Sequence, residues 1–311
     1  MVSPLIETPI AFLIFNRPDT TFKVFKEIEK ARPSKLLVVA DGPRTYKSGE
    51  VEKCAATRAI IDQISWDCEV LTNYSEVNLG CRKRISSGLD WIFNTVEEAI
   101  ILEDDCLPHP TFFRYCEELL EYYRDDQRVM HISGDNFQYG HKRTKDSYYF
   151  SQYTHVWGWA SWRRAWQNYD VEMKSWKTVK DGNWLADILK DRESILYWEN
   201  TFQSVYDGKA DSWSNQWLFA CWLQSGLSIL PNVNLVSNIG FGIDATHTTR
   251  KSELANIPTE AMDFPLQHPL LTLRDTQADE LTRKAQFRTS SLLGRVKKRV
   301  NKIFSTVPGV T

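Results

Sequence analysis

Three consecutive acidic residues follow an apolar segment in "IILEDDCLPHP", residues 100–110. Glu103, Asp104 and Asp105 repel one another when ionised, and each loses hydration if it is buried. Such a cluster can be a solvated turn, or it can bind a divalent cation such as Mg²⁺ or Mn²⁺, which prefers oxygen ligands and often bridges phosphates. The position of the acids in the fold distinguishes these two interpretations.

Short apolar segments alternate with amphipathic helical segments over the first 135 residues. The apolar segments predict strands at 9–15, 35–40, 68–73, 99–102 and 128–134. The periodic segments predict helices at 18–31, 49–64, 81–96 and 110–126. In the first of these helices, Phe22, Phe25 and Ile28 are expected to share the buried face. The alternation predicts an α/β fold with a mainly parallel sheet.

Polar residues follow several of these predicted strands. Asn16 and Arg17 follow the first, Asp41 and Arg44 follow the second, and the three acids follow the fourth. Ligands of parallel sheets bind at the carboxyl ends of the strands. The set of polar residues therefore favours a binding site at this edge, although any single one could be an ordinary loop residue.

The pattern changes after residue 148. Trp157 and Trp159 alternate as in a strand, whereas Trp159, Trp162 and Trp166 have helical spacing, and both interpretations stay open. Polar helical segments are expected over 167–210, followed by an aromatic helix at 212–226 and short strands at 227–242. We expect the C-terminal half to be built onto the sheet within one compact domain.

The composition suits a large buried core. The chain has 311 residues, of which 42% are hydrophobic. No apolar run approaches the 18 or so residues of a membrane-spanning helix, and the first run is too short for a signal-peptide core. We therefore expect a cytoplasmic protein. The six cysteines show neither a CxxC pair nor metal-ligand spacing, which predicts reduced and mostly buried thiols.

Charge is unevenly distributed along the chain. The net charge is -2, but eight basic residues and no acidic residue follow Glu280, so residues 1–280 carry -10. On a helical wheel the apolar residues between Leu292 and Val307 share one face, and five basic residues lie outside it. This pattern predicts a helix on an anionic membrane surface; the alternative is a helix docked on the acidic body. Nucleic acid is not an expected partner, because the body is acidic.

The segment "AIILEDDCLPHPTFFRY" resembles the metal-binding segment of GT-A glycosyltransferases. It is most similar to the N-acetylglucosaminyltransferase I type and to bacterial nucleotide-diphospho-sugar transferases. The segments "PIAFLIFNRPD", "VVADGPR", "NLGCRKRI" and "GWASWRRAW" fit the same pattern, so the resemblance covers roughly residues 8–250. It implies a GT-A domain at 1–270, with a nucleotide-binding half at 1–140 and an acceptor half at 141–270. A basic amphipathic tail would occupy 271–311.

The resemblance implies roles for the acidic residues. Asp105 would be the direct ligand of Mn²⁺ or Mg²⁺, and Glu103 and Asp104 would contact the ribose and the donor sugar. Asp41 would accept a hydrogen bond from the base, for example from the imide N–H of uracil; alternatively it only caps a turn. His247, after the glycine-rich "GFG", would contact the metal or the diphosphate, although a single histidine is more often structural.

The resemblance also implies roles for basic and amide side chains. Asn16 and Arg17 would lie near the nucleotide. Arg82, with Lys83 or Arg84, would face the nucleotide or its diphosphate, since a guanidinium donates two bonds to phosphate. The alternative for Arg17 and Arg82 is a surface charge.

Tryptophans are core residues by default, but sugars also stack on aromatic rings. The resemblance places Trp157 and Trp159 beside the donor sugar. Trp213 and Trp217 could line the acceptor site.

The expected catalytic base departs from the family pattern. Related enzymes carry an acid in a W-D-x-W segment, whereas this chain reads "DSWSNQW". Asp211 is the nearest carboxylate. It is either the general base that takes the acceptor proton or an ordinary loop acid.

These features together predict a metal-dependent glycosyltransferase that moves a sugar from a nucleotide diphosphate, UDP in the first instance, to a hydroxyl. The expected acceptor is a growing glycan or lipid-linked saccharide in polysaccharide biosynthesis at the inner face of the cell membrane, with inversion at the sugar. One alternative is a sugar-nucleotide pyrophosphorylase, which should carry a glycine-rich phosphate loop where this chain has "NRPDT". The other is a non-enzymatic glycan-binding protein.

Overall fold

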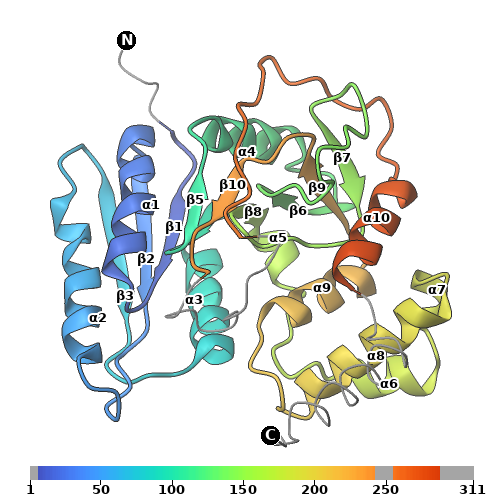
Figure 1. The fold of residues 1–311 in the computed structure, drawn as a ribbon, viewed down its shortest axis with the longest axis horizontal. Coiled ribbons are helices and arrows are strands. Elements are labelled where there is room, and N and C mark those ends of the chain that lie inside the picture. The colour runs from blue at the N-terminus through green and yellow to red at the C-terminus, as the bar shows by residue number, and fades with distance from the viewer. Residues whose placement is uncertain (1–5, 242–254, 288–311) are drawn as a thin grey trace, which may run out of the picture.

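The computed structural model describes residues 6–241 and 255–287 (Figure 1). His247 and the tail from residue 288 onward lie outside the described residues, and so do the expectations placed on them. The α/β fold expected from the sequence is confirmed: helices flank a large mixed sheet.

The first half of the chain alternates strands and helices almost as expected. Its elements are β1 Ile10–Ile14, α1 Pro18–Ala31, β2 Lys35–Ala40, α2 Glu50–Ala59, β3 Glu69–Tyr74, α3 Cys81–Thr95, β4 Glu98–Glu103, β5 Cys106–Pro108, α4 Thr111–Tyr122 and β6 Val129–Ser133. A short 3-10 helix, Ile61–Gln63, follows α2. The three-residue strand β5 was not expected, because "CLP" is too short and too mixed to show a period.

The second half is richer in helix. Its elements are β7 Tyr148–Ser151, β8 Trp159–Trp162, α5 Arg163–Trp166, α6 Trp176–Asp181, α7 Leu185–Ile188, α8 Arg192–Tyr206, α9 Ser214–Leu223, β9 Leu227–Pro231, β10 Val236–Asn238 and α10 Thr276–Gln286. Both interpretations of the tryptophan segment are partly right, since Trp159 and Trp162 are in a strand and Trp166 ends the helix that follows it.

Eight of the described strands form one sheet in the order β3-β2-β1-β4-β8-β6-β9-β7. The four strands β3, β2, β1 and β4 are parallel to one another. Beyond β4 the pairing is mixed: β8 is antiparallel to both β4 and β6, β6 is parallel to β9, and β7 is antiparallel to β9. A second, two-stranded sheet pairs β10 with β5. The parallel half therefore follows the βαβ pattern, and the other half is mixed.

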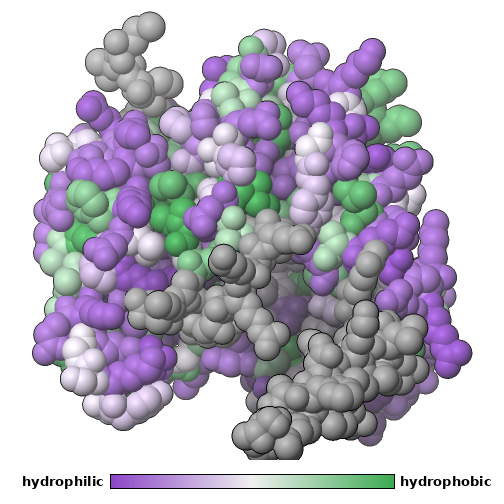
Figure 2. Space-filling view, viewed as in Figure 1, coloured by the Kyte–Doolittle hydropathy of each residue, from purple (hydrophilic) through white to green (hydrophobic). Residues whose placement is uncertain are grey.

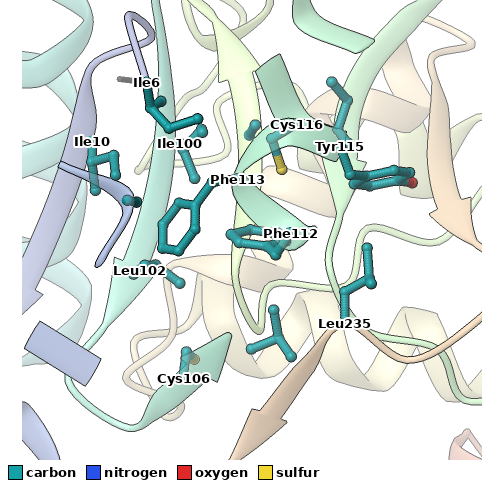
Figure 3. Close-up of a cluster of buried hydrophobic side chains, with 14 of the residues drawn as sticks. Ile6, Ile10, Ile100, Leu102, Cys106, Phe112, Phe113, Tyr115, Cys116 and Leu235 are labelled. Carbon is teal, nitrogen blue, oxygen red and sulfur yellow. The ribbon is translucent and has the colours of Figure 1, made fainter. Parts of the chain in front are cut away.

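Alternate side chains of the central strands enter two separate cores. Ile10, Phe12 and Ile14 of β1 pack with α1 and α4 on one face of the sheet, and Ala11 and Leu13 pack with α3, α5 and α9 on the other. This alternation follows from the two-residue period of a strand. Figure 3 shows the first core, in which Phe112 and Phe113 of α4 point into a cluster with Ile100 and Leu102 of β4.

One side chain expected in this core lies outside it. Phe22 is 40% exposed, whereas Phe25 and Ile28 are fully buried. The buried face of α1 also takes Thr21 and Val24. The buried face of α1 is therefore rotated by about one residue from the face expected from the sequence, because the small, polar Thr21 packs inward in place of Phe22.

A third core, which is rich in aromatic residues, fills the region of α6, α7, α8 and α9. Figure 1 shows these helices below and beside the sheet. Helix α10 packs against β7, where Ala278 meets Tyr149 and Leu230. Residues 276–286, which the sequence prediction assigned to the tail, are thus attached to the body in this structure.

The surface carries small and separate apolar areas on the face that Figure 2 shows, among mostly hydrophilic residues. Within residues 6–241 and 255–287, no helix is long and apolar enough to cross a membrane. All six cysteines are free, and Cys54, Cys106, Cys116 and Cys221 are buried, as expected.

Candidate functional site

The carboxyl ends of β1, β2 and β4 lie side by side. Ile14 of β1 pairs with Ala40 of β2, and Leu13 pairs with Glu103 of β4. The residues that follow these strands therefore converge on one edge, where a cleft of about 590 Å³ opens. The cleft is also lined by residues of the loop before β8 and by residues that lead into α9.

The three acids of the opening motif all line this cleft. Arg17 donates Nη1 to Asp105 Oδ2 at 2.8 Å, and its Nη2 pairs with Asp104 Oδ1. Asp104 is nearly fully buried and also accepts the backbone N–H of Phe15 at 3.2 Å. The carboxylate of Glu103, the last residue of β4, has no hydrogen-bond partner among the described residues. Three carboxylates thus share one guanidinium.

The pKa values reflect this surplus of negative charge. Burial, together with repulsion from Asp105 and Asp104, raises the pKa of Glu103 to about 8. Burial also raises the pKa of Asp104 to about 6, although Arg17 opposes the shift. Both shifts have the sign expected where carboxylates are brought together with too little positive charge.

Gly240 allows the chain after β10 to pass directly over the acids. A Cβ atom at this position would lie 2.1 Å from Asp105 Oδ2 and 2.7 Å from Arg17 Nη1. The approach is held by the N–H of Ile239, which donates to the Asp105 carbonyl at 2.8 Å, and by Asn238 Oδ1, which accepts the Gly240 N–H. Only glycine fits here without displacing the charged side chains.

Asp41 lines the cleft, but protein donors already fill its carboxylate. Oδ1 accepts the N–H groups of Gly42 and Leu79, both at 2.9 Å. Oδ2 accepts Asn78 Nδ2 at 2.9 Å and the Gly80 N–H at 3.2 Å. Burial raises its pKa, against the effect of these N–H donors. Asp41 therefore joins the end of β2 to the loop before α3.

Asn16 and Arg44 meet at Glu50 rather than in open cleft. Asn16 Nδ2 donates to Glu50 Oε1 at 2.8 Å and does not line the cleft. Arg44 donates Nε to Glu50 Oε2 at 2.8 Å, and its guanidinium lies 5.3 Å from the ring centre of Phe15. The bonds from Arg44 lower the pKa of Glu50 to about 2. Arg44 is a cleft residue, whereas Asn16 supports it from behind.

The structure does not bring Arg82 and Lys83 into the cleft. Arg82 donates to the Val171 carbonyl at 2.8 Å, and Lys83 is exposed on the same helix. Arg84, one turn from the helix start, does line the cleft. Its guanidinium is held by the carbonyls of Ala40 and Asn73. Side chains at the start of a helix point in different directions, so neighbouring basic residues cannot all face one ligand.

The four tryptophans assigned to sugars divide into two pairs. Trp157 and Trp213 line the cleft. Trp159 and Trp217 are fully buried and do not. Trp159 instead stacks on Trp213, with ring centres 5.7 Å apart. Trp159 therefore lies behind Trp213, which lines the cleft. To contact the donor sugar as expected, Trp159 would have to leave the core.

Asp211 lies in the cleft, is exposed, and has a fixed position. Its Oδ1 accepts the N–H of Arg82 at 2.9 Å and its Oδ2 the N–H of Cys81 at 3.2 Å. It therefore caps the start of α3 across a long sequence separation. Each oxygen keeps a lone pair that could accept a proton.

The donor set suits a hard divalent cation that brings other ligands with it. Among the described residues, no group of three or more His, Cys, Asp or Glu side chains is arranged to hold a metal ion. Mg²⁺ sites commonly use one or two carboxylates and complete their shell with water and phosphate oxygens. Asp105, 15% exposed at its side chain and facing the cleft, fits this second kind of site.

Three cleft residues were not singled out from the sequence as binding residues. Asn78 and Gly240 carry no charge and have no motif around them that marks a ligand. Arg44 was noted at the end of its strand, but nothing in "DGPR" shows that Glu50 holds its side chain. Strand-end position was the available signal for Arg44. Gly240 begins the glycine-rich "GFG" noted before His247, but nothing in the sequence shows that it lies against the acids.

Comparisons with known proteins identify no family. No protein-family model matches the chain, and no curated protein does. Among solved structures, a UDP-glucose pyrophosphorylase complexed with UDP-glucose matches with a TM-score of 0.26 and 11% identity, over 51% of this chain and 71% of that chain. A match at this TM-score supports no conclusion about function, which we therefore infer from the geometry of the cleft.

Proposed function

We propose that this protein is a metal-dependent glycosyltransferase that transfers a sugar from a nucleoside diphosphate to an acceptor hydroxyl. The supporting observation is the placement of the acid triplet at the carboxyl end of β4, inside a cleft that both halves of the molecule line. A solvated acidic turn would leave all three carboxylates in bulk water, whereas Asp104 is 2% exposed.

The charge of the cleft supports a requirement for a cation. Of its described lining residues, five are acidic (Asp41, Glu103, Asp104, Asp105, Asp211) and three are arginines (Arg17, Arg44, Arg84). Each of these arginines already has protein acceptors. A diphosphate entering this cleft would meet uncompensated negative charge, so a divalent ion is the means by which it could bind.

Asp105, with Asp104 behind it, would hold the cation beside the diphosphate. A bound cation supplies a Lewis acid that neutralises charge on the departing diphosphate. Arg17 keeps the two carboxylates fixed relative to β1, through its pairs with both. Trp157 lines the same cleft as the acids, and a sugar could stack on its ring.

Asp211 is the carboxylate we assign as general base. It would take the proton of the acceptor hydroxyl as that oxygen attacks the anomeric carbon of the donor, and the nucleoside diphosphate would leave from the opposite side with inversion. The two N–H bonds from α3 hold the carboxylate in place for this transfer.

A donor screen tests the proposal. Wild-type protein with Mn²⁺ should release nucleoside diphosphate slowly from one or more UDP- or GDP-sugars by hydrolysis. Asp105→Ala should lose this release, while Asp187→Ala, which changes an exposed acid on α7, should keep it. Formation of UTP from UDP-sugar and pyrophosphate would identify a pyrophosphorylase instead. Binding of glycans without any nucleotide binding would identify a lectin.

We further propose that residues 288–311, which lie outside the described residues, attach the enzyme to an anionic membrane where a lipid-linked or growing saccharide would be the acceptor. Five basic residues on the polar face of the expected helix would contribute roughly 5 kcal/mol at such a surface. Deleting 288–311 should abolish cosedimentation with anionic liposomes. Unchanged cosedimentation would refute this attachment.

A further inference from the structure

Asn78 has an amide whose orientation is fixed by its neighbours. Its Nδ2 donates to Asp41 Oδ2 and to the Gly42 carbonyl, both at 2.9 Å. Both partners are pure acceptors, so only the nitrogen of the amide can face them. The carbonyl oxygen Oδ1 must then point the other way. Asn78 lines the cleft, and its Oδ1 accepts no hydrogen bond from the described residues.

Asp41, by contrast, has little capacity left for a ligand. An ionised carboxylate offers about four acceptor positions, and Asp41 receives donors from Gly42, Asn78, Leu79 and Gly80. A base N–H could bind Asp41 only by displacing one of these bonds. The structure therefore separates two tasks: Asp41 orders the loop, and Asn78 presents the free acceptor.

Planar groups border the same part of the cleft. Arg44 lies over the ring of Phe15, and both line the cleft with Asn78. The loops that carry Arg44 and Asn78 are in direct contact, since a Cβ on Gly42 would lie 2.5 Å from the backbone of Val77. A flat ring could therefore stack near Arg44 while its edge reaches Asn78.

We propose that Asn78 Oδ1 reads the nucleobase of the donor by accepting the imide N–H of uracil. This inference rests on the proposed function. Uracil, like guanine, presents a ring N–H beside a carbonyl, whereas cytosine and adenine present a ring acceptor there. Asn78 would repel that acceptor, so the contact selects against CDP and ADP as well as for UDP.

Calorimetric titration of the full chain in Mn²⁺ with UDP and with 3-methyl-UDP, which lacks only the imide N–H, tests the contact. Wild type should bind UDP about tenfold more tightly than 3-methyl-UDP, which corresponds to about 1.4 kcal/mol for the bond lost at the partly buried Asn78. Asn78→Ala should bind both ligands with equal, weak affinity. Asn94→Ala, at an exposed asparagine on α3, should keep the wild-type ratio.

Two other results would contradict the proposed contact, and they have different consequences for the proposed function. If wild type binds UDP and 3-methyl-UDP equally, or if Asn78→Ala keeps the preference, Asn78 does not read the base, and the proposed transferase activity is untouched. If wild type binds no UDP at millimolar concentration, the proposed function fails and this inference fails with it. The comparison of the two ligands on wild type needs no variant to fold.

Discussion

The two halves of the sheet supply cleft residues in different ways. In the parallel half, β1, β2 and β4 all end at the cleft, so the residue after each strand is placed there by topology. In the mixed half, three of the four strand pairs are antiparallel and β6 is parallel to β9, and the aromatic side chains mostly pack on one another. In the parallel half, the position of a residue directly after a strand therefore identifies it as a cleft residue. In the mixed half, the aromatic character of a residue does not.

Substitutions of Trp159, a core residue, and of Trp157, a cleft residue, should differ most in their effects. Trp159 is fully buried and stacks on His131, with ring centres 5.1 Å apart, so Trp159→Ala should lower the free energy of unfolding by about 3–5 kcal/mol. Trp157 is only partly buried, and Trp157→Ala should cost about 1 kcal/mol while weakening use of the sugar donor. Urea denaturation and donor hydrolysis measure the two effects. Equal losses of stability would contradict the division into core and cleft tryptophans.

Asp211 tests whether the mixed half also contributes chemistry. Asparagine at this exposed position can still accept one of the two N–H groups with its oxygen, so Asp211→Asn should lower the melting temperature only modestly, but it cannot take a proton. Transfer to a hydroxyl acceptor should fall by roughly 10²–10⁴-fold, as measured by initial rates, with UDP affinity preserved. Activity close to wild type would show that Asp211 only caps α3.

Gly240 tests the parallel half, because it lies against the acids. Gly240→Ala should push Asp105 and Arg17 apart and weaken Mn²⁺ binding in the presence of UDP by about tenfold, as changes next to metal ligands commonly do. Gly140→Ala serves as a control away from the cleft: a Cβ there meets nothing within 4 Å, and its positive φ of 82° adds only local backbone strain. Titration of Mn²⁺ into the UDP-saturated protein measures both. Equal affinities for the two variants would show that the acids take no part in cation binding.

His131, in the mixed half, gives a smaller and purely structural effect. Its Nε2 donates to the His155 carbonyl at 2.7 Å, and its Nδ1 accepts from Trp217 Nε1 at 3.2 Å. Burial lowers its pKa to about 3, so the folded protein keeps this ring neutral while the unfolded chain protonates it below pH 6.5. Stability should therefore fall as the pH drops from 6.5 towards 3, by about 1.4 kcal/mol per pH unit.

Urea denaturation at pH 6.5 and 5.5, compared between wild type and His131→Gln, isolates this contribution. The variant should show a smaller loss over the same interval. An identical pH dependence in both proteins would mean that other groups account for it.

Most strands and helices could be predicted because each has a strong period or a continuous apolar run, as in β1, β2 and β4. The edge shared by Arg17, Asp41 and Asp105 followed from the rule for parallel sheets. The order of strands beyond β4 could not be predicted, since a strand such as β8 has the same apolar pattern in either direction. The buried state of Phe25 followed from the helical period, but the exposure of Phe22 depends on packing against neighbours.

Partners of side chains were the least predictable part of the site. Asp41 carries a carboxylate, which suggests an acceptor for a nucleobase. In the structure its four donors come from its neighbour Gly42 and from residues 78–80, which only the fold brings close to it. Likewise, "NLGCRKRI" shows three basic residues, and only the helix orientation reveals that Arg84 faces the cleft while Arg82 and Lys83 do not. Sequence gives the chemistry available, and tertiary contacts determine which atoms remain free.

The central claim is that Asp105 holds a divalent ion through which the diphosphate of a sugar donor binds in the cleft. Calorimetric titration of UDP into wild type and Asp105→Asn, each with Mn²⁺ and with EDTA, measures it directly. Wild type should bind UDP at least tenfold more tightly with Mn²⁺ than with EDTA, and Asp105→Asn should bind UDP weakly in both. UDP binding to wild type that is equally tight with EDTA, or an Asp105→Asn variant that keeps the full Mn²⁺ enhancement, would contradict it.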